Sequence, residues 1–197
     1  MAVAVVLIFV YVVGFKEEEI TNSPSTNSGV VAFGDSLVEG VGSARGGGFV
    51  RMLSEDFDLA ITNLGRSGDT TGDALGRIDQ LANIRPAVTI VLLGGNDYLR
   101  RVERGKTLAN LDTIIEVIHG SGSAVLLVGL EKEIFGGADS KLFEKLVKDN
   151  KTAYVPDILD GIFGDTELMS DELHPNDAGY RIMADRIKPI LKKLLIE

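Results

Sequence analysis

Four short blocks of the chain contain residue types that could together carry out nucleophilic acyl transfer. They span residues 34–37, 63–70, 94–97 and 171–174. Acyl transfer needs a nucleophile, hydrogen-bond donors for a developing oxyanion, and a base oriented by a carboxylate. The blocks supply these parts between them, whereas any one block alone would indicate little.

The candidate nucleophile is Ser36, in the first block. A serine hydroxyl attacks a carbonyl only when a base lies beside it. We expect Ser36 to open a helix, whose first amides carry a partial positive charge where an oxyanion would form. The structural alternative is that Ser36 only caps this helix, which is the commoner role of a serine there.

The candidate base is His174, which Asp171 precedes by three residues. This spacing lets the carboxylate hold one ring nitrogen while the other nitrogen faces Ser36. The alternative for Asp171 is a solvated loop acid beside Glu172. The other histidine, His119, is more simply a favourable charge at the C-terminus of a helix.

Candidate oxyanion donors are the side-chain amide of Asn96 and the backbone amide of Gly68. We expect Gly68 to be glycine because a side chain would crowd the donor. The alternative for residues 94–97 is an ordinary turn, since Gly and Asn are common turn formers. Asp97 is interpreted as structural.

The elements that must position these residues alternate along the chain. Short apolar runs at residues 30–33, 59–63, 87–93, 124–129 and 152–155 predict strands, the last only weakly. Helical spacing of apolar residues predicts helices around 75–81, 108–118 and 180–194, with a kink at Pro189. This pattern predicts an α/β fold, a three-layer α/β/α sandwich with a parallel, flavodoxin-like central sheet. Ligands bind at the carboxyl ends of such strands, where the first three blocks lie.

The N-terminal residues 1–15 are nearly all apolar, from Ala2 to Phe15. As a helix this run would cover about 21 Å, short of a bilayer core of about 30 Å. It is typical of an export signal or short membrane anchor, and predicts an extracytoplasmic, secreted or membrane-anchored protein. A buried strand or a wrongly placed start site are the alternatives, and without a signal the protein would be cytoplasmic. Residues 16–28 are interpreted as a polar linker, flexible over 21–29, and residues 29–197 as the catalytic domain.

The composition excludes several classes of partner and site. The chain has 197 residues, a formal charge of −9 and no cysteine. We therefore expect no nucleic-acid partner, because such binding relies on clustered Lys and Arg. Disulfides and thiolate metal sites are excluded, and we expect no metal or other cofactor. Residues 105–107 and 40–45 resemble phosphate and dinucleotide motifs, but both motifs are incomplete.

From about Val30 to its end, the chain resembles the GDSL, or SGNH, family of serine hydrolases in all four blocks. It looks most similar to the bacterial multifunctional thioesterase, arylesterase and lysophospholipase branch. The resemblance implies an SGNH hydrolase fold and a serine esterase that cleaves carboxylic esters or thioesters, such as aryl esters, lysophospholipids or acyl-CoA, through an acyl-enzyme. It implies Ser36 as nucleophile, His174 as base, Asp171 as its orienting acid, and an oxyanion hole of Ser36, Gly68 and Asn96.

Residues 131–140 depart from that branch, where a loop usually covers the acyl chain, so acyl preference stays open. The nearest alternative function is a carbohydrate O-deacetylase on the same scaffold. A non-catalytic binding module and a flavodoxin-like nucleotide binder are the others.

Overall fold

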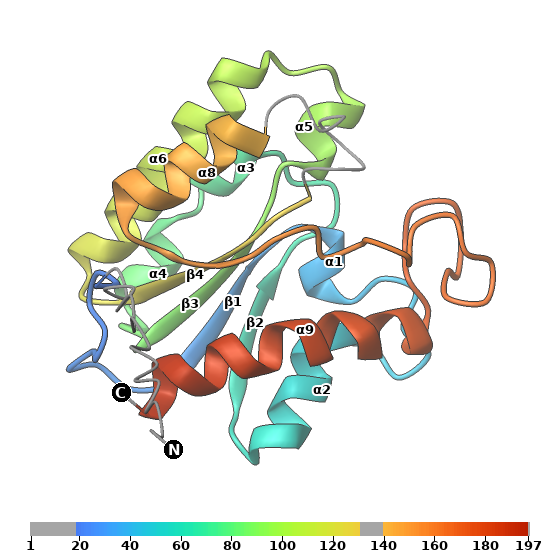
Figure 1. The fold of residues 1–197 in the computed structure, drawn as a ribbon, viewed down its shortest axis with the longest axis horizontal. Helices are drawn as coiled ribbons and strands as arrows, with labels where there is room; N and C mark the ends of the chain where they lie inside the picture. The colour runs from blue at the N-terminus through green and yellow to red at the C-terminus, as the bar shows by residue number, and fades with distance from the viewer. Residues whose placement is uncertain (1–18, 131–139, 197) are drawn as a thin grey trace, which may run out of the picture.

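Five parallel strands form the centre of the computed structural model, which describes residues 19–130 and 140–196 (Figure 1). They are β1 (Val30–Gly34), β2 (Ile61–Gly65), β3 (Val88–Leu92), β4 (Ala124–Val128) and β5 (Ala153–Val155). Their order is β2-β1-β3-β4-β5, which confirms the flavodoxin-like sheet. The weak fifth strand is present and pairs with β4.

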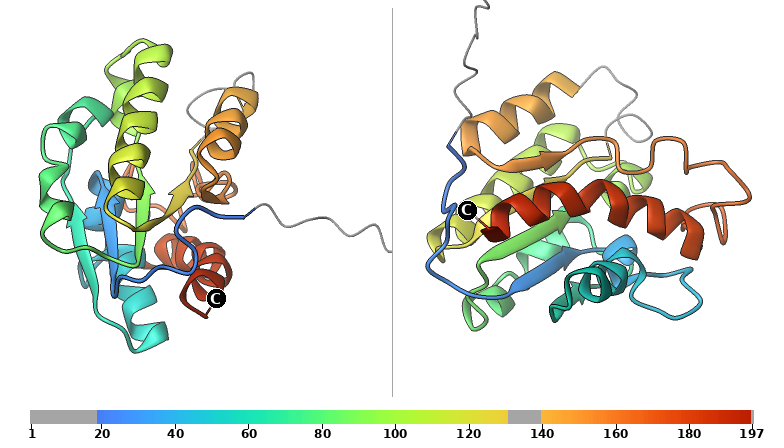
Figure 2. Two further views of the ribbon diagram at one scale, coloured as in Figure 1. Left: turned by 90° about the vertical axis from the view of Figure 1, so that its left-hand side faces the viewer. Right: turned by 60° about the horizontal axis from the view of Figure 1, so that its bottom comes forward.

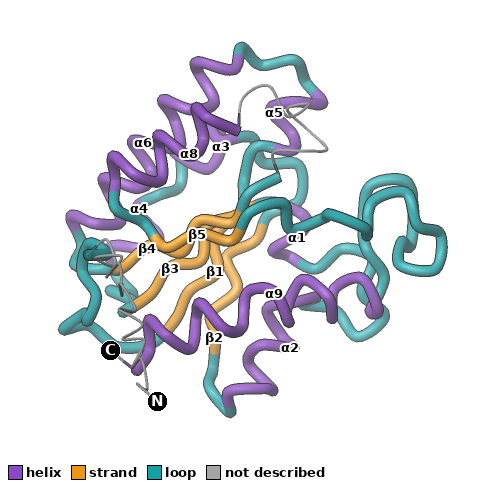
Figure 3. The backbone as a smooth tube through the Cα atoms, viewed as in Figure 1, coloured by secondary structure: helices purple, strands orange, loops and turns teal. Residues whose placement is uncertain are grey.

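Helices cover both faces of this sheet and complete three layers (Figures 2 and 3). One face carries α2 (Gly48–Phe57) and α9 (Asp177–Ile196). The other carries α3 (Thr71–Leu75), α4 (Asp79–Ala82), α6 (Arg104–Gly120) and α8 (Ser140–Asn150). Two further short helices, α1 (Ser36–Glu39) and α5 (Gly95–Leu99), directly follow the ends of β1 and β3.

Alternate residues of each strand pack into the hydrophobic cores on the two faces of the sheet, because successive side chains point to opposite faces. In β1, Val30 and Ala32 pack with α2 and α9, whereas Val31 and Phe33 pack with the helices of the other face. Every residue of β1, β3 and β4 is buried. The sheet is therefore a rigid frame, and its carboxyl edge holds the first three blocks at fixed separations.

Two of the predicted elements are placed or divided differently in the structure. β2 begins at Ile61 rather than at residue 59, because it pairs in parallel register with β1 from Ile61 opposite Val30. The helix predicted over 75–81 is two short helices, since α3 ends at Leu75, with Gly76 as its C-cap, and a turn separates it from α4.

The final helix is assigned as one element through Pro189, so the predicted kink does not interrupt it. A proline removes the hydrogen bond to the carbonyl four residues earlier, here that of Asp185. Both residues are exposed, so the missing bond costs less than it would inside the core.

Residues 21–29, which the sequence predicted to be a flexible linker, form hydrogen bonds to the domain. The Asn22 side chain donates to the carbonyls of His119 and Ser123, and Asn27 donates to those of Pro86 and Ser121. These bonds satisfy backbone carbonyls at the amino edge of the sheet, so the polar side chains of this segment have a structural role.

The predicted export signal at residues 1–15 lies outside the described residues, as does most of the divergent stretch at 131–140. Within 19–130 and 140–196, no helix has the length and apolar character needed to span a membrane.

Candidate active site

Three side chains from opposite ends of the chain form one hydrogen-bonded series. Ser36 Oγ lies 3.0 Å from His174 Nε2, and His174 Nδ1 lies 2.9 Å and 3.0 Å from the two carboxylate oxygens of Asp171. With the proton on Nδ1, the ring donates to Asp171 and accepts from the serine hydroxyl. This is the arrangement in which a histidine can take a proton from a serine.

Ser36 is presented by the sharp transition from β1 to α1. The strand ends at Gly34, and the Asp35 carboxylate accepts the amide of Leu37 at 3.0 Å, so Asp35 is the N-cap. Ser36 is the first helical residue, and its side chain is left to face His174. The alternative in which Ser36 caps the helix is therefore wrong.

The loop before α9 holds Asp171 and His174 together. Asp171 Oδ1 accepts the amides of Leu173 and His174, both at 2.8 Å. The His174 hydrogen bond, followed by these amides, lowers the pKa of Asp171 from 3.8 to about 2. Although its side chain is 54% exposed, Asp171 is bound to the histidine rather than a free loop acid.

Gly42 lets the α1–α2 loop approach this histidine loop. A Cβ at Gly42 would lie 2.5 Å from the Pro175 carbonyl and 3.2 Å from His174 Cβ, and its φ is +92°. Buried Tyr180 of α9, the helix that follows the histidine loop, also holds the α1–α2 loop, because its hydroxyl donates to the Val41 carbonyl at 2.7 Å. Any larger residue at 42 would push the histidine loop away.

The two candidate oxyanion donors line the same cavity as Ser36 and His174. Asn96 lies in α5, and its Nδ2 donates to the Asp69 carbonyl at 3.0 Å, with Asp35 Oδ2 at 3.4 Å. Gly68 lies in the loop after β2. The turn interpretation of residues 94–97 is incomplete, because residues 95–97 begin α5, which places Asn96 in the cavity wall.

Position 68 favours glycine because of its backbone conformation, not because a side chain would lack room. Its φ is +83°, a region that L side chains rarely adopt. A Cβ there would meet only Arg100 Nη2 at 3.4 Å, the end of a flexible side chain. The expected crowding of the donor is therefore not the reason for glycine.

Asp97 is structural, as predicted. It is buried and accepts the amide and hydroxyl of Thr71 at 2.8 Å and 2.6 Å, and the hydroxyl of Thr107 at 3.2 Å. These bonds join α3, α5 and α6 behind the site.

His119 lies in the last turn of α6, where a helix C-terminus was predicted, but the positive charge predicted for it is not favoured. Its Nε2 is buried without a hydrogen-bond partner among the described residues, and burial lowers the pKa of the ring. Desolvation favours the neutral imidazole here over the attraction of a helix C-terminus.

The cavity has a volume of about 360 Å³, and sequence reasoning missed most of its wall. Its apolar lining residues are Leu37, Tyr98, Leu99, Leu130, Leu159, Phe163 and Leu173. Four of these are large apolar residues exposed to solvent, namely Tyr98, Leu99, Phe163 and Leu173. Tyr98 and Leu99 directly follow the third block and Leu173 lies within the fourth, so their positions beside the motifs were the available signal.

Asp35 is a further residue whose environment sequence reasoning missed. It is buried, and desolvation raises its pKa from 3.8 to about 7 in spite of the Leu37 amide and the facing His174. The negative charges of Asp69 and Asp97 raise the pKa of Asp35 further. The folded state therefore holds this proton in a pH range where the unfolded chain has lost it.

We expect Asp35→Asn to stabilise the protein at neutral and alkaline pH. Because the folded-state pKa is raised, stability falls as pH rises from 3.8 to about 7, by up to ~4 kcal/mol. Asparagine keeps the cap without the charge. Urea unfolding at several pH values checks this, and a difference between variant and wild type that stays constant from pH 4 to 8 would contradict it.

Known proteins match this chain over most of its length. The model of the GDSL-like lipase/acylhydrolase family matches residues 32–182. Esterase TesA of Pseudomonas aeruginosa is 31% identical over 178 residues, which cover 84% of this chain and 89% of the relative. Thioesterase 1/protease 1/lysophospholipase L1 of Escherichia coli K12 is 25% identical over 175 residues, 84% of each chain. The crystal structure of TesA superposes with a TM-score of 0.78 at 30% identity, covering 85% of this chain and all of the other.

Proposed function

The chain belongs to the GDSL-like lipase/acylhydrolase family and hydrolyses ester or thioester bonds as a serine hydrolase, and we propose that Ser36, His174 and Asp171 carry out this reaction in two acyl-transfer steps. The observation that carries the assignment is the unbroken hydrogen-bonded series from Asp171 through His174 to Ser36 Oγ.

In the first step, Ser36 Oγ attacks the carbonyl carbon and its proton passes to His174 Nε2. Asp171 holds the ring through Nδ1 and stabilises the imidazolium that forms. The tetrahedral oxyanion is bound by the amides of Ser36 and Gly68 and by Asn96 Nδ2. When the intermediate collapses, His174 gives its proton to the leaving alcohol or thiol, and an acyl-enzyme remains.

In the second step, a water molecule takes the place of the leaving group. His174 accepts a proton from this water as it attacks the acyl carbonyl, and the same donors bind the second oxyanion. Collapse returns the proton to Ser36 Oγ and releases the carboxylic acid.

A fluorophosphonate probe tests the nucleophile directly, because it forms a covalent bond only with an activated serine. We expect peptide mass spectrometry to find the label on Ser36. An intact, folded protein in which Ser36 stays unlabelled would instead favour the non-catalytic binding module.

We expect Asn96→Ala to lower kcat by about 10²- to 10³-fold, since losing one oxyanion donor typically costs that much. KM should change little, because the interaction forms in the transition state. Steady-state kinetics on an aryl ester measures both constants. A variant with a raised KM and an unchanged kcat would instead place Asn96 in substrate binding alone.

We propose that the acyl group is an aliphatic chain rather than acetyl. The wall beside Ser36 is formed by leucines and aromatic side chains, which favour apolar groups through burial. Sugars need several convergent polar side chains, so this wall supports acyl esters over acetylated carbohydrate.

A series of aryl esters from acetyl to decanoyl, with an acetylated sugar as comparison, tests this proposal. We expect kcat/KM to rise from acetyl to medium chains by about tenfold or more, as each buried methylene contributes ~0.8 kcal/mol. Preference for the acetylated sugar would support the deacetylase instead.

We also propose that the protein acts outside the cytoplasm. The support is the uncharged apolar run from Ala2 to Phe15. Fractionation of the cells, with mass spectrometry of the mature N-terminus, tests this proposal, which full-length protein in the cytoplasmic fraction would contradict.

A further inference from the structure

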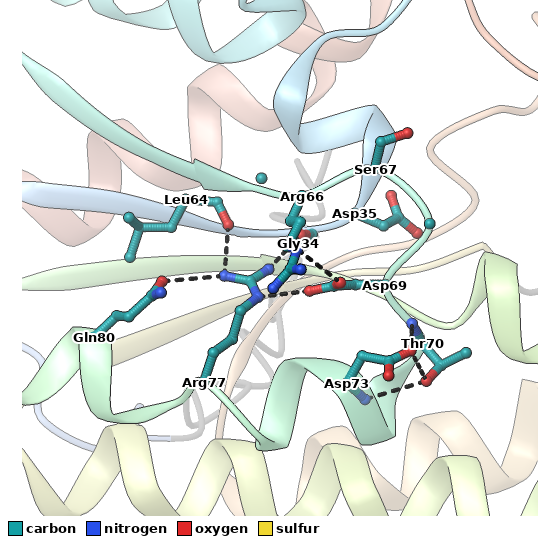
Figure 4. A network of polar contacts seen from close by, with 12 residues as sticks. Gly34, Asp35, Leu64, Arg66, Ser67, Asp69, Thr70, Asp73, Arg77 and Gln80 are labelled. Atoms are coloured by element: carbon teal, nitrogen blue, oxygen red, sulfur yellow. Dashed lines mark hydrogen bonds and ion pairs between the residues drawn. The ribbon is translucent and has the colours of Figure 1, made fainter.

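A nearly buried arginine that the mechanism does not use lies beneath the oxyanion loop, defined as residues 66–70. Arg77 lies in the turn between α3 and α4, and only 9% of its side chain is exposed. Its Nε donates to the Asp69 carboxylate at 2.5 Å, Nη1 to the Leu64 carbonyl at 3.0 Å, and Nη2 to the Gly34 carbonyl at 2.8 Å (Figure 4). All three guanidinium nitrogens are therefore engaged.

The backbone acceptors of Arg77 are the carboxyl ends of two strands that carry the site. Gly34 ends β1, two residues before Ser36, and Leu64 lies at the end of β2, just before the oxyanion loop. The guanidinium also stacks on Phe33 of β1, with Cζ 4.4 Å from the ring centroid. Arg77 thus fixes the loop to the strand that presents the nucleophile.

Asp69, held by Arg77, in turn constrains the two proposed oxyanion donors that do not lie in α1, the Gly68 amide and the Asn96 side chain. Its backbone follows Gly68 directly, so a shift of Asp69 moves the Gly68 amide. Its carbonyl accepts Asn96 Nδ2 at 3.0 Å, so the same shift changes the aim of the Asn96 side chain. Asp69 is buried, and a buried carboxylate needs a charged partner to stay in place.

We propose that Arg77 is a positioning residue for ester hydrolysis, which holds the Gly68 amide and the Asn96 side chain in place through Asp69. The proposal rests on the oxyanion hole proposed above. Arg77 does not belong to the cavity wall as the structure describes it, so it acts through these groups rather than on the substrate.

Arg77→Lys tests the proposal, because lysine keeps the charge but has one nitrogen and cannot serve three separated acceptors. We expect kcat to fall at least tenfold while KM changes less than threefold. Arg181→Lys is the matched control: Arg181 also pairs with an aspartate, Asp56, but it joins α9 to α2 away from the cavity. This control should keep kcat within twofold.

A double-mutant cycle with Asn96→Ala separates positioning from general destabilisation. If Arg77 acts through the oxyanion hole, the two kcat losses should be strongly less than multiplicative. Losses that multiply, or an unchanged kcat in folded Arg77→Lys, would overturn the proposal. Thermal melting shows whether each variant is folded at the assay temperature.

Asp69→Asn is the second variant, used if Arg77→Lys does not fold. It keeps the backbone carbonyl and an oxygen for Nε but weakens the ion pair, so kcat should fall severalfold with little change in KM. An unchanged kcat in this variant would also count against the proposal. Failure of the proposed function would appear differently, as activity retained in Ser36→Ala.

Discussion

Ser36→Ala should lower kcat/KM for an aryl ester by about 10⁴- to 10⁶-fold, the range found when a serine nucleophile is removed from a triad. Without Oγ no acyl-enzyme can form, so the residual rate comes only from water attacking a carbonyl polarised by the remaining donors. The Ser36 hydroxyl contacts His174 in the structure, and its removal leaves the cap at Asp35 and the core unchanged.

Stopped-flow or steady-state kinetics, with circular dichroism as the control for folding, checks this expectation. The melting temperature of Ser36→Ala should stay within a few degrees of wild type, because one exchangeable hydrogen bond is worth about 1 kcal/mol. Turnover similar to wild type in the variant would end the proposed mechanism, whichever substrate is used.

His174→Ala should cost a similar factor, because Ser36 then has no base and the leaving group has no acid. The rate constants of acylation and of deacylation should both fall, since His174 serves both steps. Pre-steady-state kinetics separates these steps. A variant that still released the first product in a rapid burst would show that another group activates Ser36.

The rate should fall as pH is lowered, because protonated His174 cannot accept the serine proton. Asp171 does not cause this fall, since its pKa of about 2 keeps it ionised throughout the range. Asp35, whose pKa burial raises to about 7, changes its charge near neutral pH. The Asp35→Asn variant separates the two: it should keep the acid fall in kcat/KM, and a flat profile in that variant would assign the fall to Asp35.

The chemistry and the layers of this protein could be predicted from local patterns. Ser36, Gly68 and Asn96 follow apolar runs, and a parallel sheet gathers the carboxyl ends of its strands at one edge. Asp171 and His174 are three residues apart, so their contact is a local property. The five strands follow from short apolar runs bounded by polar segments, and the face-forming residues of α6 and α9 follow from the 3.6-residue helical period.

What the sequence by itself determined is therefore the set of groups proposed to react and the order of the sheet. Tertiary structure alone decided the rest: the approach of His174 to Ser36 across 138 residues, the raised pKa of Asp35, the apolar cavity wall, the Arg77 contacts beneath the oxyanion loop, and the docking of residues 21–29. Burial, desolvation and long-range hydrogen bonds depend on which distant segments pack together, and no local spacing carries that information.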